Sequence, residues 1–304
     1  MLDKESKHKP IKSAIIVSKV YKRPVAGAIR EIASFLQSLG VTAYLDQNTS
    51  VGFNIPEVPC ISRKQMQNQD LIIVVGGDGS VLGAARTLVD LNVPVLGVNR
   101  GHLGLLTDVS PSQLHQALTS IVAGRYTKEM RMMLDVRVTR ENEDGASELV
   151  GQSLATNETV IHSGMLAHMM VFSVSIDDNF MYSLRGDGII VNTPTGSTAY
   201  SLSAGGPIIE PHLDVLSLVP MFPQSLNCSP IIIPGSSAVR IDFERPETPE
   251  WININCDGQV TIRGDTNCTV SICQHKTPLT LIHPEGYDYY SVLRQKLGWG
   301  QQLF

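Results

Sequence analysis

Residues 71–84 read LIIVVGGDGSVLGA, and this stretch decides the fold of the first half of the chain. Its first five residues are apolar and mostly branched, the pattern of a parallel strand that is covered on both faces. The glycines and Asp78 that follow predict a turn into a helix over residues 79–90. Because ligands of open α/β sheets bind at the carboxyl ends of strands, we expect Asp78 to lie at a binding site.

The glycine loop is a candidate phosphate loop. Gly76, Gly77 and Gly79 let the backbone turn tightly and let its N–H groups approach an anion. A negative charge at the tip of such a loop does not help to hold a phosphate, so Asp78 is expected to accept a proton or a metal. Local hydrogen bonding within the turn is the alternative. The spacing fits a simple Rossmann fingerprint poorly, and no GxxxxGK[ST] loop occurs in the sequence.

Strand and helix patterns alternate through the first 126 residues. Strands are expected at residues 13–18, 41–46, 71–75 and 93–98, and helices at residues 24–39, 79–90 and 111–123. This alternation is typical of a doubly wound parallel sheet, so we predict a Rossmann-like α/β domain over residues 1–126. Residues 47–68 show no clear period and are expected to form a loop.

After residue 126 the pattern becomes that of β-strands. Strands are expected at residues 130–140, 168–176, 239–244 and 251–256, with turn signals at Asp177-Asp178-Asn179 and Asp257-Gly258. Apolar and charged residues alternate over residues 239–244, as in a half-buried antiparallel strand. We therefore predict a mainly antiparallel, all-β domain over residues 127–285. The tail at residues 286–304 has helical composition and could pack back on the first domain.

Composition limits the partners and the compartment. A length of 304 residues favours two domains, and the net charge of -5 with no Lys/Arg block argues against a nucleic-acid or membrane-surface binder. No apolar run is long enough to span a membrane, and the first ten residues have no signal-peptide core. Five cysteines without a CxxC pair favour reduced thiols. We expect a cytoplasmic protein with no nucleic-acid or membrane partner.

Two short polar segments of the second half are candidates for ligand binding. Asn157 and Glu158 stand at the start of an apolar strand, where they could hydrogen-bond ribose hydroxyls or an adenine edge. A turn is the alternative for this pair. Arg185 and Asp187 belong to an RGDG bend that leads into another apolar strand. An ion pair between them at the bend is the alternative.

A third polar segment, residues 192–206, reads NTPTGSTAYSLSAGG. Its small side chains allow a ligand to approach the backbone, and Ser197 or Thr198 is expected to cap a short helix whose N–H groups face an anion. Tyr200 adds a flat surface on which a ring could stack. A purely structural loop is the alternative.

Together these motifs resemble the bacterial NAD kinase family. The resemblance rests on GGDG at 76–79, NE at 157–158, GDG at 186–188, TPTGSTAYSLSAGGPI at 193–208, LVPMFP at 218–223 and LGW at 297–299. GGDG alone is also similar to phosphofructokinases and diacylglycerol-type lipid kinases, whereas TPTGSTAY after GDG is much more specific. The resemblance covers the chain from about residue 71 to the C-terminus.

The resemblance implies transfer of the γ-phosphate of ATP to the 2′-hydroxyl of the adenosine ribose of NAD, giving NADP. It implies that Asp78 accepts the proton of that hydroxyl, that a divalent metal ion such as Mg²⁺ takes part, and that the chain forms a dimer or tetramer. No metal ligand is assigned. The residues it assigns to NAD are Asp78, Gly79, Asn157, Glu158, His168, Arg185, Asp187, Thr198, Ala199, Tyr200, Ser201, Leu202, Ser203 and Gln259. Of these, it implies that His168, Arg185 and Asp187 line the NAD site or reach it from a neighbouring subunit, and that residues 198–203 surround the adenine side.

One further expectation concerns how the site distinguishes NAD from NADP, and two alternative functions stay open. Charged carboxylates at Asp78 and Glu158 would repel the 2′-phosphate of NADP and so favour NAD. A lipid or sugar kinase that shares only the GGDG loop is one alternative function. A non-catalytic NAD(P)-binding regulator on the same scaffold is the other.

Overall fold

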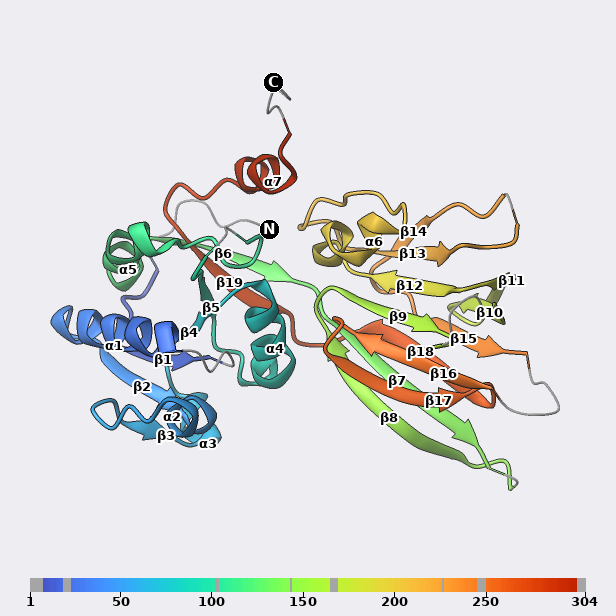
Figure 1. Cartoon of the computed structure of the whole chain (residues 1–304), viewed down its shortest axis with the longest axis horizontal. Helices are drawn as coiled ribbons and strands as arrows, with labels where there is room; N and C mark the ends of the chain where they lie inside the picture. Colours follow the sequence, from blue (N-terminus) through green and yellow to red (C-terminus); the bar gives the residue numbers. More distant parts are fainter. Residues whose placement is uncertain are drawn as a thin grey trace. The chain divides into compact units, whose positions relative to one another are not determined.

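The computed structural model describes residues 8–18, 23–101, 104–142, 144–164, 169–225, 227–244 and 250–299 (Figure 1). The chain divides into two compact units, one formed by Met1–Met130 with Leu279–Phe304 and the other by Arg131–Pro278. The sequence predicts boundaries near residues 126 and 286. The observed division lies a few residues away because strands β6 (Tyr126–Arg131) and β19 (Leu279–Pro284) both join the sheet of the first unit.

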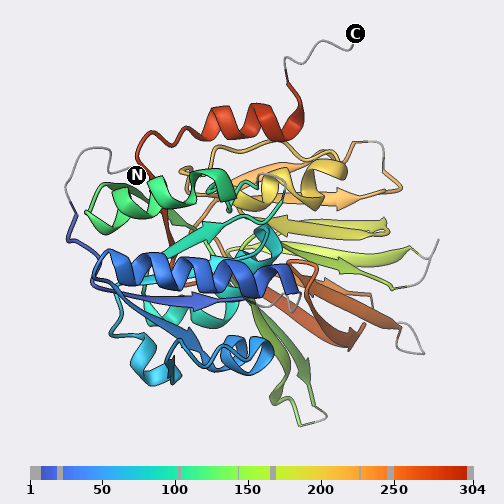
Figure 2. The ribbon, with the colours of Figure 1, turned by 60° about the vertical axis from the view of Figure 1, so that its left-hand side comes forward.

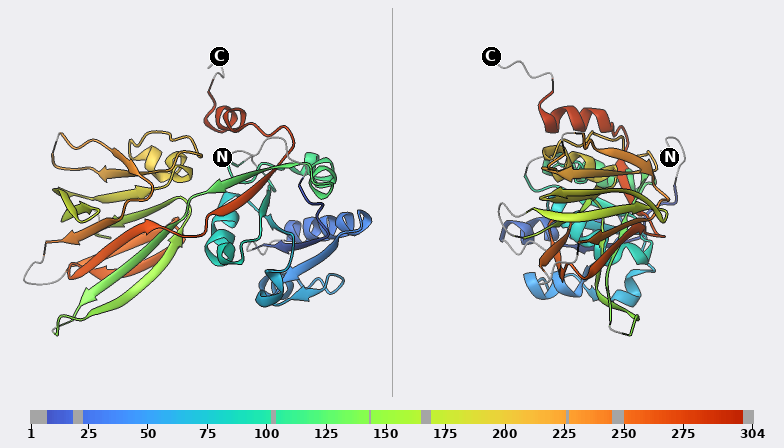
Figure 3. Two further views of the ribbon diagram at one scale, coloured as in Figure 1. Left: turned by 180° about the vertical axis from the view of Figure 1, so that it is seen from behind. Right: turned by 90° about the vertical axis from the view of Figure 1, so that its right-hand side faces the viewer.

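The first unit is built on a seven-stranded sheet with the order β3-β2-β1-β4-β5-β19-β6. Its other strands are β1 (Ser13–Val17), β2 (Thr42–Asp46), β3 (Cys60–Ile61), β4 (Leu71–Val75) and β5 (Val95–Val98). The pairs from β3 through β19 run parallel. All five residues of β4 are buried, as expected for a central strand that is covered on both faces. Figure 3 shows β19 and β6 side by side at one edge.

The first unit contains the helices α1 (Arg23–Ser38), α2 (Gln47–Phe53), α3 (Arg63–Met66), α4 (Asp78–Leu88), α5 (Leu114–Val122) and α7 (Tyr289–Leu297), with 3₁₀ turns η1 (Val89–Leu91) and η2 (Pro111–Gln113). Helix α1 lies across β1 and β2 (Figure 2) and buries Ile29, Ile32 and Leu36 in the core that these strands share. Gly40 lies just beyond the end of α1, and its φ of 76° is the left-handed conformation that glycine adopts after helix ends.

The expectation that residues 47–68 form a loop is wrong. This stretch contains α2, β3 and α3. Asp46 caps α2 by accepting the N–H groups of Asn48 and Thr49, and Ser62 and Gln65 form a capping box on α3. Helices of seven and four residues are too short to show a helical period in the sequence, so their caps are the better signal.

The second unit consists of two six-stranded antiparallel sheets, with the orders β11-β10-β15-β18-β7-β8 and β14-β13-β12-β9-β16-β17. Its strands are β7 (Leu134–Glu141), β8 (Ser147–Ala155), β9 (Glu158–His162), β10 (Met170–Ile176), β11 (Asn179–Gly186), β12 (Gly188–Asn192), β13 (Val215–Met221), β14 (Ile231–Pro234), β15 (Val239–Phe243), β16 (Trp251–Cys256), β17 (Val260–Asp265) and β18 (Cys268–Gln274). Side chains from both sheets form one buried core, including Phe172 and Ile241 from one sheet and Ile161 and Ile254 from the other.

The turn signals of this unit are confirmed. Asp177 and Asp178 join β10 to β11, and Asp257 and Gly258 join β16 to β17. All four residues have positive φ, between 50° and 63°, which is the backbone of the hairpin turns that match strand twist. An α/β first unit and an antiparallel β second unit therefore confirm the predicted fold class. No helix among the described residues is long and apolar enough to cross a membrane.

Candidate active site

The glycine loop lies at the carboxyl end of β4, as predicted. Gly76 continues the strand ladder by donating its N–H to Val98 O at 3.0 Å, and α4 begins directly at Asp78. Gly77 has φ −98°, so its conformation does not require glycine. A Cβ added there would meet no atom within 4 Å. Close approach of a ligand, rather than the geometry of the turn, is the remaining reason for glycine at this position.

The Asp78 carboxylate is held by one segment of chain. Oδ2 accepts the N–H of Leu105 at 2.9 Å, and Oδ1 accepts the N–H of Leu106 at 3.1 Å and the hydroxyl of Thr107 at 2.9 Å. The side chain is half-buried and stands in the first turn of α4, where the helix dipole favours a negative group. The partners lie 27 to 29 residues away in sequence, so the local turn alternative is excluded.

Sequence reasoning missed the residues that support Asp78. Thr107 is fully buried, Asn99 donates to its hydroxyl at 2.9 Å, and a Cβ at Gly104 would come within 1.9 Å of Asp78 Oδ1. These residues follow β5, the parallel neighbour of β4. Because neighbouring parallel strands end at the same edge of a sheet, the position of this segment directly after the β5 strand is the sequence signal that predicts its contact with the glycine loop.

In the second unit, the Asn157-Glu158 pair is fixed by a carboxylate from a distant hairpin. Asp257 accepts the N–H of Thr156 at 3.0 Å, that of Asn157 at 2.7 Å and that of Glu158 at 3.4 Å. Its own N–H donates to Glu158 O at 2.9 Å. Gln259 follows in the same hairpin turn, where its N–H donates to Cys256 O at 3.0 Å. Asp257 was predicted only as a turn residue.

The segment that begins at Thr193 packs on the backbone of Asn157. The Thr193 hydroxyl donates to Thr156 O at 2.6 Å, and the Thr193 N–H donates to Asn157 O at 2.9 Å. A Cβ at Gly196 would lie 2.1 Å from Asn157 O, so only glycine fits there. Two motifs that are separate in sequence therefore form one polar corner of this unit.

The expected helix cap at Ser197 or Thr198 is wrong. Residues Thr195–Thr198 form a 3₁₀ turn, η3, and Tyr200–Ser203 form the short helix α6, whose N-cap is Ala199 without a side-chain hydrogen bond. The Ser197 hydroxyl instead accepts the N–H of Ile209 at 2.9 Å and donates to Pro194 O at 2.6 Å. Ser197 thus ties the loop to residues further along the chain.

The residues predicted to surround the adenine differ in exposure. Tyr200 is 49% exposed and offers the expected flat surface. Thr198, Ala199 and Leu202 are half-buried, and Ser203 is exposed. Ser201 is fully buried, so its side chain supports the loop from within.

Glu158 has a buried side chain, 5% exposed, and its Oε2 has no hydrogen-bond partner among the residues that the structure describes. Burial, and then the negative charge of Asp257, raise the pKa of Glu158 to about 8. At pH 7 most molecules therefore carry a proton on this side chain. The expectation of two charged carboxylates is thereby corrected, because sequence alone does not reveal how deeply Glu158 is buried.

Arg185 and Asp187 lie away from this corner within the chain. In the pairing of β12 with β9, Gly188 faces His162 and Asn192 faces Glu158, so the bend and Glu158 stand at opposite ends of these strands. Four residues of strand span roughly 13 Å. Among the described residues, Arg185 and Asp187 form no ion pair with each other, which removes that alternative. His168 lies outside the described residues.

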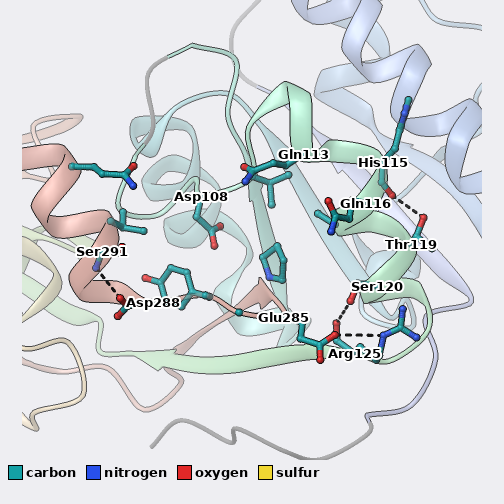
Figure 4. Close-up of a pocket in the computed structure, with 17 residues that line it drawn as sticks. Asp108, Gln113, His115, Gln116, Thr119, Ser120, Arg125, Glu285, Asp288 and Ser291 are labelled. Atoms are coloured by element: carbon teal, nitrogen blue, oxygen red, sulfur yellow. Dashed lines mark hydrogen bonds and ion pairs between the residues drawn. The ribbon is translucent and has the colours of Figure 1, made fainter.

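A cavity of about 880 Å³ in the first unit lies between α5 and α7 (Figure 4). Its lining includes Asp108, Tyr287 and the ion pair of Arg125 with Glu285, and among the described residues it does not include Asp78. His283 bridges Asp108 and Glu129 with both distances at 2.9 Å, and all three side chains are buried. This buried triad joins β19, β6 and the segment after β5.

A glycine loop with a carboxylate at the end of a parallel strand, together with a polar corner on an antiparallel β unit, defines a two-domain nucleotide-binding protein. Two family models match the chain: the ATP-NAD kinase N-terminal domain over residues 14–126 and the ATP-NAD kinase C-terminal domain over residues 156–283. The chain belongs to the ATP-NAD kinase family.

Individual relatives agree with this assignment. The NAD kinase of Tolumonas auensis is 43% identical over 290 residues, which cover 95% of this chain and 97% of the relative. The NAD kinase of Aeromonas salmonicida is 42% identical over 296 residues, covering 97% and 99%. The crystal structure of yeast NADH kinase complexed with NADH shares the fold with a TM-score of 0.82 at 23% identity, covering 99% of this chain and 93% of that one. Membership of this family excludes the alternative functions, which were a lipid or sugar kinase and a non-catalytic NAD(P)-binding regulator.

Proposed function

We propose that this chain is an NAD kinase, which uses ATP to phosphorylate the 2′-hydroxyl of the adenosine ribose of NAD. The observation that carries the proposal is similarity to NAD kinases along almost the whole chain, 43% over 290 residues in one case. The placement of Asp78 supports it, since the carboxylate stands at the strand end where α/β sheets bind ligands.

In the proposed reaction the ribose 2′-oxygen forms a bond to the γ-phosphorus of ATP while the bond from that phosphorus to the β,γ-bridging oxygen breaks. ADP leaves, and the hydroxyl proton passes to the Asp78 carboxylate. Phosphoryl transfer is catalysed mainly by positioning and charge neutralisation. A base within hydrogen-bond reach of the hydroxyl contributes a factor on the order of a hundred to ten thousand.

The polar corner of the second unit would position the dinucleotide. Hydrogen bonds to Asp257 fix the backbone of Asn157 and Glu158, and so fix the points from which their side chains extend. A protonated Glu158 can donate one hydrogen bond and accept another, as a ribose hydroxyl requires. Tyr200 and its neighbours Thr198 to Ser203 are assigned to the adenine side, with Ser201 acting through packing.

A divalent metal ion, Mg²⁺, is proposed to neutralise the phosphate charge of ATP. Among the described residues, no group of three or more His, Cys, Asp or Glu side chains is placed to hold a metal. Mg²⁺ is usually bound by one or two carboxylates together with substrate phosphates and so needs no such cage.

We assign Arg185 and Asp187 to contacts with NAD that is bound by a second copy of the chain, in a dimer or tetramer. Their position at the opposite strand ends from Glu158 supports this assignment. A cytoplasmic location remains a prediction.

The reaction is tested with purified protein, NAD, ATP and Mg²⁺, with NADP followed by an NADP-specific dehydrogenase. We expect NADP and ADP in equal amounts. NAD that lacks only the 2′-hydroxyl of the adenosine ribose is the matched control and should give no ADP above background. ADP release from that analogue equal to release with NAD would contradict 2′-phosphorylation.

A further inference from the structure

Among the described residues, hydrogen-bond donors occupy both lone-pair directions of one oxygen of the Asp78 carboxylate but only one direction of the other. Oδ1 accepts two, from Leu106 N at 3.1 Å and from Thr107 Oγ1 at 2.9 Å, whereas Oδ2 accepts one, from Leu105 N at 2.9 Å. A carboxylate has about two lone-pair directions on each oxygen. Oδ2 therefore keeps one direction in which it can accept a proton.

The direction of the Thr107 hydroxyl follows from Asn99. A hydroxyl has a single hydrogen to donate. Asn99 Nδ2 stands 2.9 Å from Thr107 Oγ1, and because an amide nitrogen only donates, Thr107 is the acceptor in that contact. The hydroxyl hydrogen is left for Asp78 Oδ1.

The orientation of the Asn99 amide is itself determined. Its Oδ1 accepts the N–H of Gly101 at 2.6 Å, and its Nδ2 also lies 3.4 Å from Thr107 O. Exchanging the amide oxygen and nitrogen would place two donors against each other at Gly101 and two acceptors against each other at Thr107 O. The hydrogen bonds from Asn99 to Thr107 and from Thr107 to Asp78 thus run in one direction.

We call the two hydrogen bonds from Asn99 to Thr107 and from Thr107 to Asp78 the relay. The Asn99 and Thr107 side chains of this relay are buried and tightly packed. Thr107 is 0% exposed and Asn99 3% exposed. A Cβ at Gly104 would lie 2.4 Å from Thr107 Oγ1, and a Cβ at Gly97 would lie 2.2 Å from Leu106 O. Neither the hydroxyl nor the Leu106 N–H can easily move away from the carboxylate.

We propose that Asn99 and Thr107 are positioning residues that hold Oδ1 of Asp78, so that Oδ2 is the oxygen that takes the proton of the ribose hydroxyl. The inference rests on the proposed function of Asp78. Neither Asn99 nor Thr107 needs to touch NAD, ATP or the transferred phosphate. Their loss should therefore slow the chemical step and leave substrate binding nearly unchanged.

Three variants test the relay. Thr107→Ser keeps the hydroxyl and removes a methyl group. Thr107→Val keeps the shape and removes the hydroxyl. Asn99→Asp keeps the size and replaces the donor by an acceptor, so the Thr107 hydroxyl would turn towards residue 99 and away from Asp78.

We expect kcat of Thr107→Ser to stay within threefold of the unmodified protein. We expect Thr107→Val and Asn99→Asp each to lower kcat by roughly 10- to 100-fold, because a base displaced by a fraction of an ångström loses much of its effect. KM for NAD, and the NAD affinity measured by calorimetry, should change less than threefold. The double variant should be no more than threefold slower than the slower single variant, because both changes break one relay.

Equal loss of kcat in Thr107→Ser and Thr107→Val would overturn the proposal, since shape rather than the hydroxyl would then matter. So would a folded Thr107→Val variant with kcat within threefold of the unmodified protein. If Thr107→Val does not fold, Asn99→Asp decides alone, and undiminished kcat there rejects the relay. Asp78→Asn is assayed in parallel, because its retention of activity would reject the base role itself rather than the positioning of the base.

Discussion

At the scale of single residues, we expect the protonation of Glu158 to set how strongly the product NADP inhibits the proposed reaction. Burial raises the pKa of Glu158 to about 8, so the side chain is mostly neutral at pH 7 and mostly charged at pH 9. A charged carboxylate repels a 2′-phosphate, by about 1 to 4 kcal/mol for unit charges roughly 4 Å apart in a solvent-screened site.

We therefore predict that Glu158→Gln changes the inhibition constant of NADP by less than threefold at pH 7 and lowers it by about tenfold at pH 9. The measurement is competitive inhibition by NADP against NAD at both pH values and low ionic strength, where charge effects are largest. KM for NAD serves as the control. Equal effects at pH 7 and pH 9 would show that Glu158 acts by shape or hydrogen bonding instead of charge.

Gly196 illustrates how one residue can hold two motifs together. We predict that Gly196→Ala weakens NAD binding by at least tenfold, because its Cβ would lie 2.1 Å from Asn157 O and would push the polar corner apart. Calorimetric titration with NAD measures the effect. Gly27→Ala is the matched control, since nothing lies within 4 Å of that Cβ and alanine is favoured in a helix by about 0.5 to 1 kcal/mol. Unchanged NAD affinity in Gly196→Ala would separate the corner from NAD binding.

At the scale of elements, the buried triad holds β19, the strand with which the chain re-enters the first unit, against β6 and the segment after β5. His283 on β19 contacts Glu129 on β6 and Asp108 after β5. A neutral imidazole has only one N–H, so donating to both carboxylates requires the charged form. Burial alone lowers the pKa of His283, but its hydrogen bonds to Asp108 and Glu129 and their charges outweigh burial and raise the pKa.

Because the pKa of His283 is raised on folding, its contribution to stability is complete below the unfolded value of about 6.5 and is lost as pH rises through the folded value. We predict that His283→Gln lowers the free energy of unfolding at pH 6 by about 3 to 5 kcal/mol, as expected when a buried ion pair loses one partner. Urea unfolding at pH 6 and at alkaline pH measures this, and the loss should be smaller at alkaline pH.

His115→Gln provides the control for this experiment. His115 pairs with Glu31 on the surface, where its side chain is 57% exposed, and such pairs contribute about 0 to 1 kcal/mol. A destabilisation of His283→Gln no larger than that of His115→Gln would contradict the role given to the triad.

At the scale of the whole molecule, the proposed sharing of NAD between copies has a direct consequence. Asp187 directly precedes β12, at the opposite end of that strand from Asn192, which faces Glu158, so a contact with NAD would come from a second copy. We predict that Asp78→Asn and Asp187→Ala proteins, each inactive alone, regain up to about a quarter of full activity after unfolding and refolding as a mixture. Mixed oligomers are verified by native mass spectrometry. Verified mixtures without activity would argue against sharing.

The sequence predicts most of this architecture because the patterns involved are local. β4 shows its burial as an unbroken apolar run, β15 shows alternation, and Asp257-Gly258 marks a hairpin. The short helices α2 and α3 were missed because seven and four residues cannot display a helical period. The motifs of the site could be identified from the sequence, but the residues that hold them in place could not.

The residues that hold the motifs in place do so through long-range contacts. Asp257 reaches Asn157 across 100 residues, and Thr107 reaches Asp78 across 29. Neither partner stands out by residue type, since an Asp in a hairpin and a Thr after a strand both have ordinary local explanations. The neutral state of Glu158 depends on burial, which is likewise a property of the folded unit.

Asp78→Asn measures whether Asp78 removes the proton from the ribose hydroxyl. The amide keeps the shape of the side chain but cannot take up the proton, so we predict a fall in kcat of roughly a hundred- to ten-thousand-fold. Calorimetric NAD affinity should change less than threefold. A folded Asp78→Asn variant with kcat within tenfold of the unmodified protein would show that Asp78 is not the base.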